Sequence, residues 1–200
     1  MKENKTLYKF LKVICKTILK VLYRPNVIGA ENIPEEGPVV FAGNHRHAFD
    51  PVVVMTSTKR MVHYIAKKEI FKGLHGKLLE AIGIIKVDRS KSNPLAIKEA
   101  QQVLLGKNGS IGIFPEGTRN KTEEDLLKFR HGAVVMAKNT NAKIVPFAIN
   151  GKYKVFRKGL TLEFGKPIDI SNLELEEANE LLRNEVLKLY RSIKIWNTYL

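Results

Sequence analysis

Apolar residues follow two kinds of pattern along this chain. Short apolar runs bounded by glycine or proline alternate with segments in which apolar residues recur every three or four positions. The short runs are typical of buried β-strands, and the periodic segments are typical of helices with one apolar face. We expect strands at residues 38–43, 62–66, 83–88, 110–114, 144–149 and, at an edge, 160–164. We expect helices at 51–58, 93–105, 132–138 and 171–192, with a short helical stretch between 66 and 83.

Strands that alternate with helices predict an α/β domain with a mixed, largely parallel sheet flanked by helices. Asp50 is expected to be the N-cap of the helix that starts at Pro51, and Ser171 and Glu174 to form a capping box for the last helix. Pro146 stands inside an apolar run and lacks an N–H group, so it indicates an edge strand or a bulge. Functional residues of such domains gather in loops at strand ends.

The first 24 residues have the pattern of a basic amphipathic helix that ends near Pro25. Five lysines fall within an arc of about 80° on such a helix; they are Lys5, Lys9, Lys12, Lys16 and Lys20. The opposite side is apolar and consists of Leu7, Phe10, Leu11, Ile14, Ile18, Val21 and Leu22. We therefore divide the chain into this helix, residues 1–24, and one domain over residues 25–200.

Two interpretations of the N-terminal helix stay open. Its lysines interrupt the apolar residues too often for a membrane span, which needs roughly 18–20 apolar residues, or for a signal peptide. In one interpretation the apolar side packs on the rest of the domain and the lysines are solvated. In the other, the helix lies in the interface of an anionic membrane.

The composition narrows the range of partners. The chain has 200 residues, of which 34 are Lys or Arg and 20 are Asp or Glu, so the formal net charge is +14. Such a charge fits an anionic partner: nucleic acid, anionic lipid or a phosphorylated substrate. No helix-turn-helix, zinc-finger or RNA-recognition signature is present, so we expect no nucleic-acid partner. The single cysteine, Cys15, excludes a disulfide within the chain.

A histidine and an aspartate stand five residues apart in the loop that follows the first buried run. The Asp50 carboxylate can accept a proton from one ring nitrogen of His45, which leaves the other nitrogen free to act as a base. The loop contains no serine or cysteine, so the pair suits direct activation of a substrate hydroxyl. His47 does not extend the pair to a metal site, because the Asp-His pair that such sites place after His-x-His is missing.

Two further loops carry residues suited to an anionic ligand. Glu116, Gly117, Thr118 and Arg119 follow the strand at 110–114 and offer a carboxylate, a flexible backbone, a hydroxyl and a guanidinium. Arg89 follows the strand at 83–88 and offers a second cation. A tight turn with a surface ion pair, and simple solvent exposure, are the alternative interpretations of these two loops.

The order of these segments resembles that of the glycerolipid acyltransferase superfamily, in particular the 1-acyl-sn-glycerol-3-phosphate acyltransferases. The resemblance extends over residues 27–165 and rests on Asn-His-x-x-x-x-Asp at 44–50, Asp-Arg at 88–89, Phe-Pro-Glu-Gly-Thr-Arg at 114–119 and Val-Pro-Phe-Ala-Ile at 145–149. The chain departs from the family at Asn120, where many members have serine, and at Arg130 and His131, where lysines are usual.

The resemblance implies a glycerol-3-phosphate acyltransferase-like fold and a reaction that needs no metal or cofactor. His45, oriented by Asp50, would act as general base for transfer of an acyl group from acyl-coenzyme A or acyl carrier protein to the 2-hydroxyl of lysophosphatidic acid. Backbone amides near His45 would be candidates to stabilise the oxyanion. The acceptor would contact Asn44, Arg89, Glu116, Gly117, Thr118 and Arg119.

The lipid nature of such an acceptor favours the membrane interpretation of the N-terminal helix, with the protein peripheral on the cytoplasmic face of the membrane. Its five lysines would then contact anionic lipid. Other acceptors, glycerol-3-phosphate or a different lysophospholipid, stay open, as does a non-catalytic module that binds anionic lipid.

Overall fold

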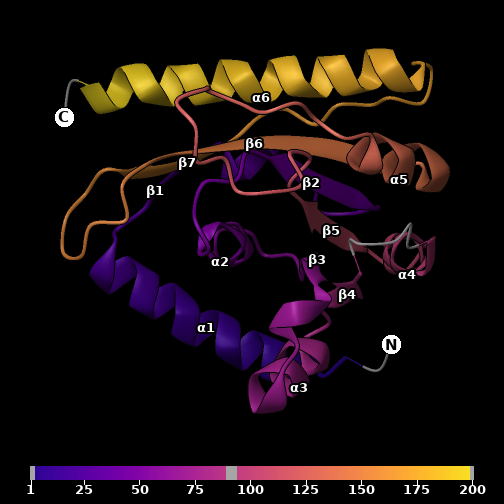
Figure 1. Cartoon of the computed structure of the whole chain (residues 1–200), viewed down its shortest axis with the longest axis horizontal. Coiled ribbons are helices and arrows are strands. Elements are labelled where there is room, and N and C mark those ends of the chain that lie inside the picture. Colours follow the sequence, from indigo (N-terminus) through magenta and orange to yellow (C-terminus); the bar gives the residue numbers. More distant parts are fainter. Residues whose placement is uncertain (1–2, 89–93, 199–200) are drawn as a thin grey trace.

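The computed structural model describes residues 3–88 and 94–198, and in them a seven-stranded sheet forms the centre of the molecule. Its strand order is β1-β7-β6-β2-β5-β3-β4 (Figure 1). All neighbouring strands are parallel except β6 and β7, which are antiparallel. The strands are β1 (Asn26–Ile28), β2 (Val39–Gly43), β3 (His63–Lys67), β4 (Ile85–Val87), β5 (Ser110–Ile113), β6 (Lys143–Gly151) and β7 (Leu160–Phe164).

Helices cover both faces of this sheet, as Figure 1 shows. One face carries α1 (Lys5–Leu22), α2 (Asp50–Thr56) and α3 (Gly73–Ala81). The other face carries α4 (Pro94–Leu104), α5 (Gly132–Thr140) and α6 (Leu175–Thr198). The expected mixed, largely parallel sheet flanked by helices is therefore confirmed.

Alternate residues of the central strands point to opposite faces, which produces two apolar cores. In β2, Val40 and Ala42 pack with α4, α5 and α6, whereas Val39 and Phe41 pack with α1 and α2. All four side chains are fully buried. A strand buried on both faces reads as a continuous apolar run, and for this reason the run at 38–43 predicted a buried strand correctly.

The edge of the sheet differs from the prediction. β7 pairs with β6 on one side and with β1 on the other, so residues 26–28 form the edge. β1 has three exposed residues, too few to produce a pattern. Pro146 lies inside β6, which pairs on both sides, so it does not mark an edge. The bulge lies in the segment that follows β7, where the three residues 165–167 lie opposite the two residues 145–146 of β6.

Two predicted helix starts are wrong. Asp50 is the first residue of α2, and Phe49 is the N-cap. The Asp50 carboxylate accepts amides of the preceding loop and therefore does not cap the helix. The last helix begins at Leu175, so Ser171 and Glu174 form no capping box. The Ser171 amide instead donates to the Asp169 carboxylate in a turn before the helix.

The N-terminal helix packs on the domain through residues that do not belong to its predicted apolar side. Tyr8 and Leu19 are buried, and the Tyr8 hydroxyl accepts a hydrogen bond from the Val62 amide. The apolar residues left exposed are Phe10, Val13, Ile14, Ile18 and Val21. Each interpretation of this helix thus accounts for some of its residues. Within the described ranges, no helix has the length and hydropathy that crossing a membrane requires.

One of the five lysines has a different environment from the expected one. The Lys12 ammonium is partly buried and donates a hydrogen bond to the Arg60 carbonyl, 2.8 Å away. Burial and the charge of Lys16 lower its pKa from 10.5 to about 8. The prediction of a solvated or lipid-facing Lys12 is therefore wrong, whereas Lys5, Lys9, Lys16 and Lys20 are exposed.

Candidate active site

Three segments that are far apart in the sequence meet at one edge of the sheet. β2, β5 and β6 are parallel neighbours, so their carboxyl ends and the loops that follow them lie together. Residues 44–50 follow β2, residues 114–120 follow β5, and residues 152–158 follow β6. Most of the residues expected to be functional lie in the first two of these loops.

His45 and Asp50 form a hydrogen-bonded pair in the first loop. The His45 Nδ1 atom lies 2.9 Å from the Asp50 Oδ2 atom. The same oxygen accepts the backbone N–H groups of Arg46 and His47, each at 2.7 Å, while Oδ1 accepts the Tyr153 hydroxyl at 2.6 Å. The carboxylate is fully buried and held by these four partners. A proton on Nδ1 leaves the lone pair of the other ring nitrogen, Nε2, free to accept one.

The His45 ring and backbone are fixed by the loop that follows β5. The ring stacks on Phe114, with centroids 4.1 Å apart and planes inclined by 20°. The His45 amide donates to Glu116 Oε1 at 2.8 Å, and its carbonyl accepts the Asn120 amide at 2.7 Å. Hydrogen bonds of the His45 backbone therefore join the loop after β2 to the loop after β5.

Asn44 and Glu116 are buried, and their polar atoms have partners within the protein. Asn44 donates to the Ile149 carbonyl and accepts the Ile149 amide, at 2.8 and 2.7 Å. The two Glu116 oxygens accept the amides of His45 and Leu127. Burial raises the pKa of the Glu116 carboxyl. These contacts tie the first loop to its neighbours; contact of either side chain with a substrate stays a prediction.

Thr118 and Arg119 are exposed at the tip of the second loop. Gly117 turns the chain there with φ +70°, and a β-carbon at this position would come within 2.9 Å of the Arg130 side chain. In the part of the chain that the structure describes, the Arg119 guanidinium has no carboxylate partner. Arg89, the second predicted phosphate contact, lies outside the described residues.

Sequence patterns missed two residues of the site. Arg46 donates to the carbonyls of Thr122 and Glu124 and lies over the ring of Tyr190 on α6. Tyr153 reaches Asp50 from 103 residues further along the chain. The one sequence feature that could have marked Arg46 as a site residue is its position between His45 and His47. Nothing in the sequence around Tyr153 indicated its partner, because the register of β6 against β2 creates the contact.

The amides proposed for oxyanion binding have other partners. The N–H group of His45 donates to Glu116, and those of Arg46 and His47 donate to Asp50. These three candidate amides thus already have acceptors within the protein.

A pocket of about 290 Å³ opens beside the pair. Its lining includes His47 and Tyr153, whose rings stack with centroids 4.1 Å apart, and the exposed Lys152. Across residues 3–88 and 94–198, no three His, Cys, Asp or Glu side chains converge where a metal ion could bind. The site thus combines a half-buried, oriented histidine with a neighbouring aromatic and basic rim.

Comparisons with known proteins identify a family and similar proteins. A family model described as Acyltransferase matches residues 24–150. A 1-acyl-sn-glycerol-3-phosphate acyltransferase of Borreliella burgdorferi is 30% identical over 182 residues, which are 84% of this chain and 72% of that protein. One of Bacillus subtilis is 34% identical over 181 residues, 86% of this chain and 88% of that protein.

A solved structure is similar over almost the whole chain. The crystal structure of the 1-acyl-sn-glycerophosphate acyltransferase PlsC from Thermotoga maritima matches with a TM-score of 0.75. The match covers 97% of this chain and 84% of that chain at 20% sequence identity, and it supports the fold.

Proposed function

This chain belongs to the Acyltransferase family, and we propose that it transfers a fatty acyl group from an acyl thioester to the 2-hydroxyl of 1-acyl-sn-glycerol-3-phosphate. The observation that carries the proposal is the His45–Asp50 pair at the end of β2, in a loop without a serine or cysteine nucleophile. The names of the relatives in Borreliella burgdorferi and Bacillus subtilis support this acceptor.

In the proposed reaction His45 is the general base. Its Nε2 atom takes the proton of the acceptor hydroxyl while the hydroxyl oxygen attacks the thioester carbonyl. A C–O bond forms, the C–S bond breaks, and the thiol of coenzyme A or of acyl carrier protein leaves as thiolate and recovers a proton. Asp50 stabilises the imidazolium that forms and keeps the ring in one orientation.

We assign Tyr153, Asn44 and Glu116 to positioning. The Tyr153 hydroxyl and the loop amides fix the Asp50 carboxylate, so the carboxylate has a single orientation toward His45. Asn44 and Glu116 fix the backbone on both sides of this pair. Preorganised groups of this kind lower the cost of reaching the transition state.

The phosphate of the acceptor is proposed to bind at the second loop. Arg119 offers a guanidinium that matches phosphate oxygens, Thr118 offers a hydroxyl, and Gly117 lets the backbone approach closely. Arg89 is proposed to supply a second cation.

The membrane role of residues 1–24 is also a proposal, as is the assignment of the acyltransferase domain to residues 25–200. The exposed apolar residues of α1 and its exposed lysines support contact with an anionic membrane from the cytoplasmic face. An enzyme held at the interface in this way reaches a lipid acceptor without extracting it from the bilayer.

Thiol release tests the proposed reaction. Purified protein is incubated with palmitoyl-coenzyme A or palmitoyl-acyl carrier protein and one of three acceptors: 1-acyl-glycerol-3-phosphate, glycerol-3-phosphate or a lysophospholipid without a free phosphate monoester. We expect thiol release that depends on 1-acyl-glycerol-3-phosphate, with phosphatidic acid as the product. Release that depends on another acceptor would replace the acceptor assignment. No release with any pair would overturn the proposed reaction.

A further inference from the structure

The loop between β6 and β7 has the composition of a membrane-contacting segment. We call residues 152–158 the 152–158 loop. Val155 and Phe156 are 50% and 64% exposed at its tip. The charged residues of the loop are all basic and exposed: Lys152, Lys154, Arg157 and Lys158. An exposed apolar pair surrounded by cations suits the interface of an anionic membrane, where apolar side chains enter the acyl boundary and cations face the headgroups.

The backbone holds Phe156 outward at a conformational cost. Phe156 has φ +59°, a left-handed conformation that bulky residues rarely adopt. Its amide donates to the carbonyl of Leu22 at the end of α1. Figure 1 shows this loop, in orange, beside that end of α1. A strained aromatic residue that remains exposed points to a role outside the core.

An aromatic cluster connects the loop to the catalytic pair. Tyr153 stacks on His47 and lies with its ring centroid 5.6 Å from that of Tyr23 and 6.2 Å from that of Phe49. Its hydroxyl donates to Asp50. Phe49 is itself 45% exposed. Aromatic side chains therefore link the base of the loop, at Tyr153, to the pocket beside His45 and Asp50.

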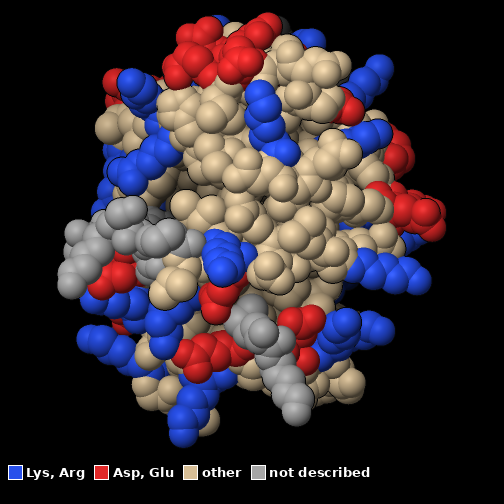
Figure 2. Space-filling view, turned by 90° about the vertical axis from the view of Figure 1, so that its right-hand side faces the viewer, with Lys and Arg blue, Asp and Glu red and all other residues tan. Residues whose placement is uncertain are grey.

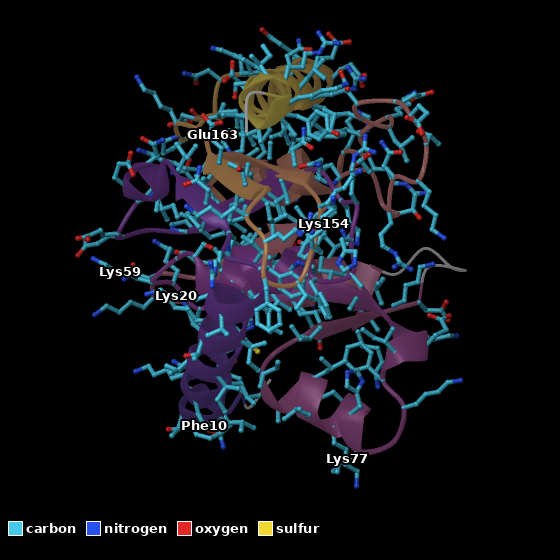
Figure 3. The ribbon with its side chains drawn as sticks, turned by 90° about the vertical axis from the view of Figure 1, so that its left-hand side faces the viewer. Phe10, Lys20, Lys59, Lys77, Lys154 and Glu163 are labelled. Carbon is cyan, nitrogen blue, oxygen red and sulfur yellow. The ribbon has the colours of Figure 1, made fainter. Side chains whose placement is uncertain are left out.

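The same side of the molecule continues onto α1. Ile18 and Val21, in the half of α1 that ends beside the loop, are exposed, and so is Lys20, which lies between them in the sequence. Figure 3 looks onto this side, with Lys20 of α1 and Lys154 of the loop labelled. On the side that Figure 2 shows, acidic side chains are interspersed with basic ones.

We propose that the 152–158 loop inserts Val155 and Phe156 into an anionic membrane and so places the lipid acceptor beside His45 and Asp50. The occupant of this surface is the bilayer itself, because the apolar tip is small and its charged neighbours are all cations. This inference rests on the proposed action on a lipid acceptor and adds a second membrane contact to that of α1.

Vesicle binding tests the loop without any need for activity. The variant Val155→Ser/Phe156→Ser is compared with wild type and with Leu95→Ser/Leu105→Ser, which replaces two leucines that are 72% and 66% exposed at α4, on the opposite face of the sheet. Co-sedimentation uses vesicles of phosphatidylcholine with and without phosphatidylglycerol. We expect the loop variant to bind the anionic vesicles roughly tenfold more weakly, because two apolar side chains are lost from the interface. The control variant should bind like wild type, and all three proteins should have the same Tm.

Activity then separates the loop from the proposed reaction. With the acceptor in vesicles, the loop variant should lose kcat/KM in parallel with binding. With a short-chain acceptor dissolved as monomers, it should match wild type. Equal vesicle binding by the loop variant and wild type would overturn the inference, and so would an equal loss of binding in the control. If no protein is active on either acceptor while the binding difference is present, the membrane contact stands and the proposed reaction fails.

Discussion

Tyr153 and Asp50 are 103 residues apart in the chain, yet their side chains share one hydrogen bond at the centre of the site. Burial and the charge of Asp50 raise the pKa of the Tyr153 hydroxyl far above its ordinary value, so it stays a donor at any physiological pH. His45 and Asp50 were predictable because one short loop carries both. Tyr153 was not, because a contact of this range depends on strand register.

Replacement of Tyr153 by phenylalanine tests its positioning role. The ring and its stacking on His47 remain, while the hydrogen bond to Asp50 is lost. We expect kcat to fall roughly ten- to hundredfold, because a hydrogen bond to a charged group contributes about 1.5–3 kcal/mol. The KM for either substrate should change little. Steady-state kinetics decides the matter: a raised KM with an unchanged kcat would assign Tyr153 to substrate binding instead.

Arg119 is expected to act on the acceptor alone. In Arg119→Gln the guanidinium is lost from an exposed loop, so the fold should be unaffected. We expect KM for 1-acyl-glycerol-3-phosphate to rise at least about tenfold and KM for the acyl thioester to stay constant, since a charge-assisted contact to phosphate is among the stronger hydrogen bonds. Lys121→Gln, two residues away and also exposed, is the matched control. Equal KM values in both variants and wild type would remove Arg119 from the phosphate site.

The elements of the fold were predictable where burial on both faces made a strand continuously apolar, as in β2 and β6. They were not predictable where tertiary pairing decides. β1 is short and exposed, so its pairing with β7 left no mark in the pattern of apolar residues. α6 begins at Leu175 and not at the predicted residue 171. Ser171 takes part in a turn with Asp169, and this turn competes with its use as a helix cap. For α1, periodicity identified the helix but not which of its sides packs.

Lys12 makes the packing of α1 depend on pH. Its pKa is about 8 in the folded protein against 10.5 in the unfolded chain, so between these values only the unfolded chain holds the proton. Raising the pH through this window therefore stabilises the fold. We expect the free energy of unfolding of wild type, minus that of Lys12→Met, to rise between pH 8 and 10.5, as urea titrations at several pH values would show. A flat difference would mean that Lys12 is solvated.

At the scale of the whole molecule, exposed apolar residues and exposed cations occur together at the end of α1 and in the 152–158 loop. Alternation of strands and helices predicted the class of fold, and the resemblance of the motifs predicted the family. The strand order could not be read from either, because it depends on which parallel neighbours pair across the chain. That order places the loops after β2, β5 and β6 at one edge and so assembles the site.

Membrane contact of α1 is best tested by substitution. Deletion of residues 1–24 would also remove Tyr8 and Leu19 from a core, so lost binding could reflect lost folding. Phe10→Ser/Ile14→Ser changes residues that are 62% and 37% exposed. We expect binding to vesicles that contain phosphatidylglycerol to weaken roughly tenfold with little change in Tm, because apolar area leaves the interface rather than the core. Binding that is as tight as in wild type would assign this helix to packing alone.

The most direct test of the account is the rate of thiol release by His45→Ala. Wild type, His45→Ala and the control His75→Ala, which changes an exposed histidine of α3, are compared with palmitoyl-coenzyme A and 1-acyl-glycerol-3-phosphate in detergent micelles. If His45 is the base, its loss should lower the rate by about 10²–10⁴, the usual contribution of general-base catalysis, while the control keeps the wild-type rate. A rate in His45→Ala equal to that of wild type would contradict the mechanism.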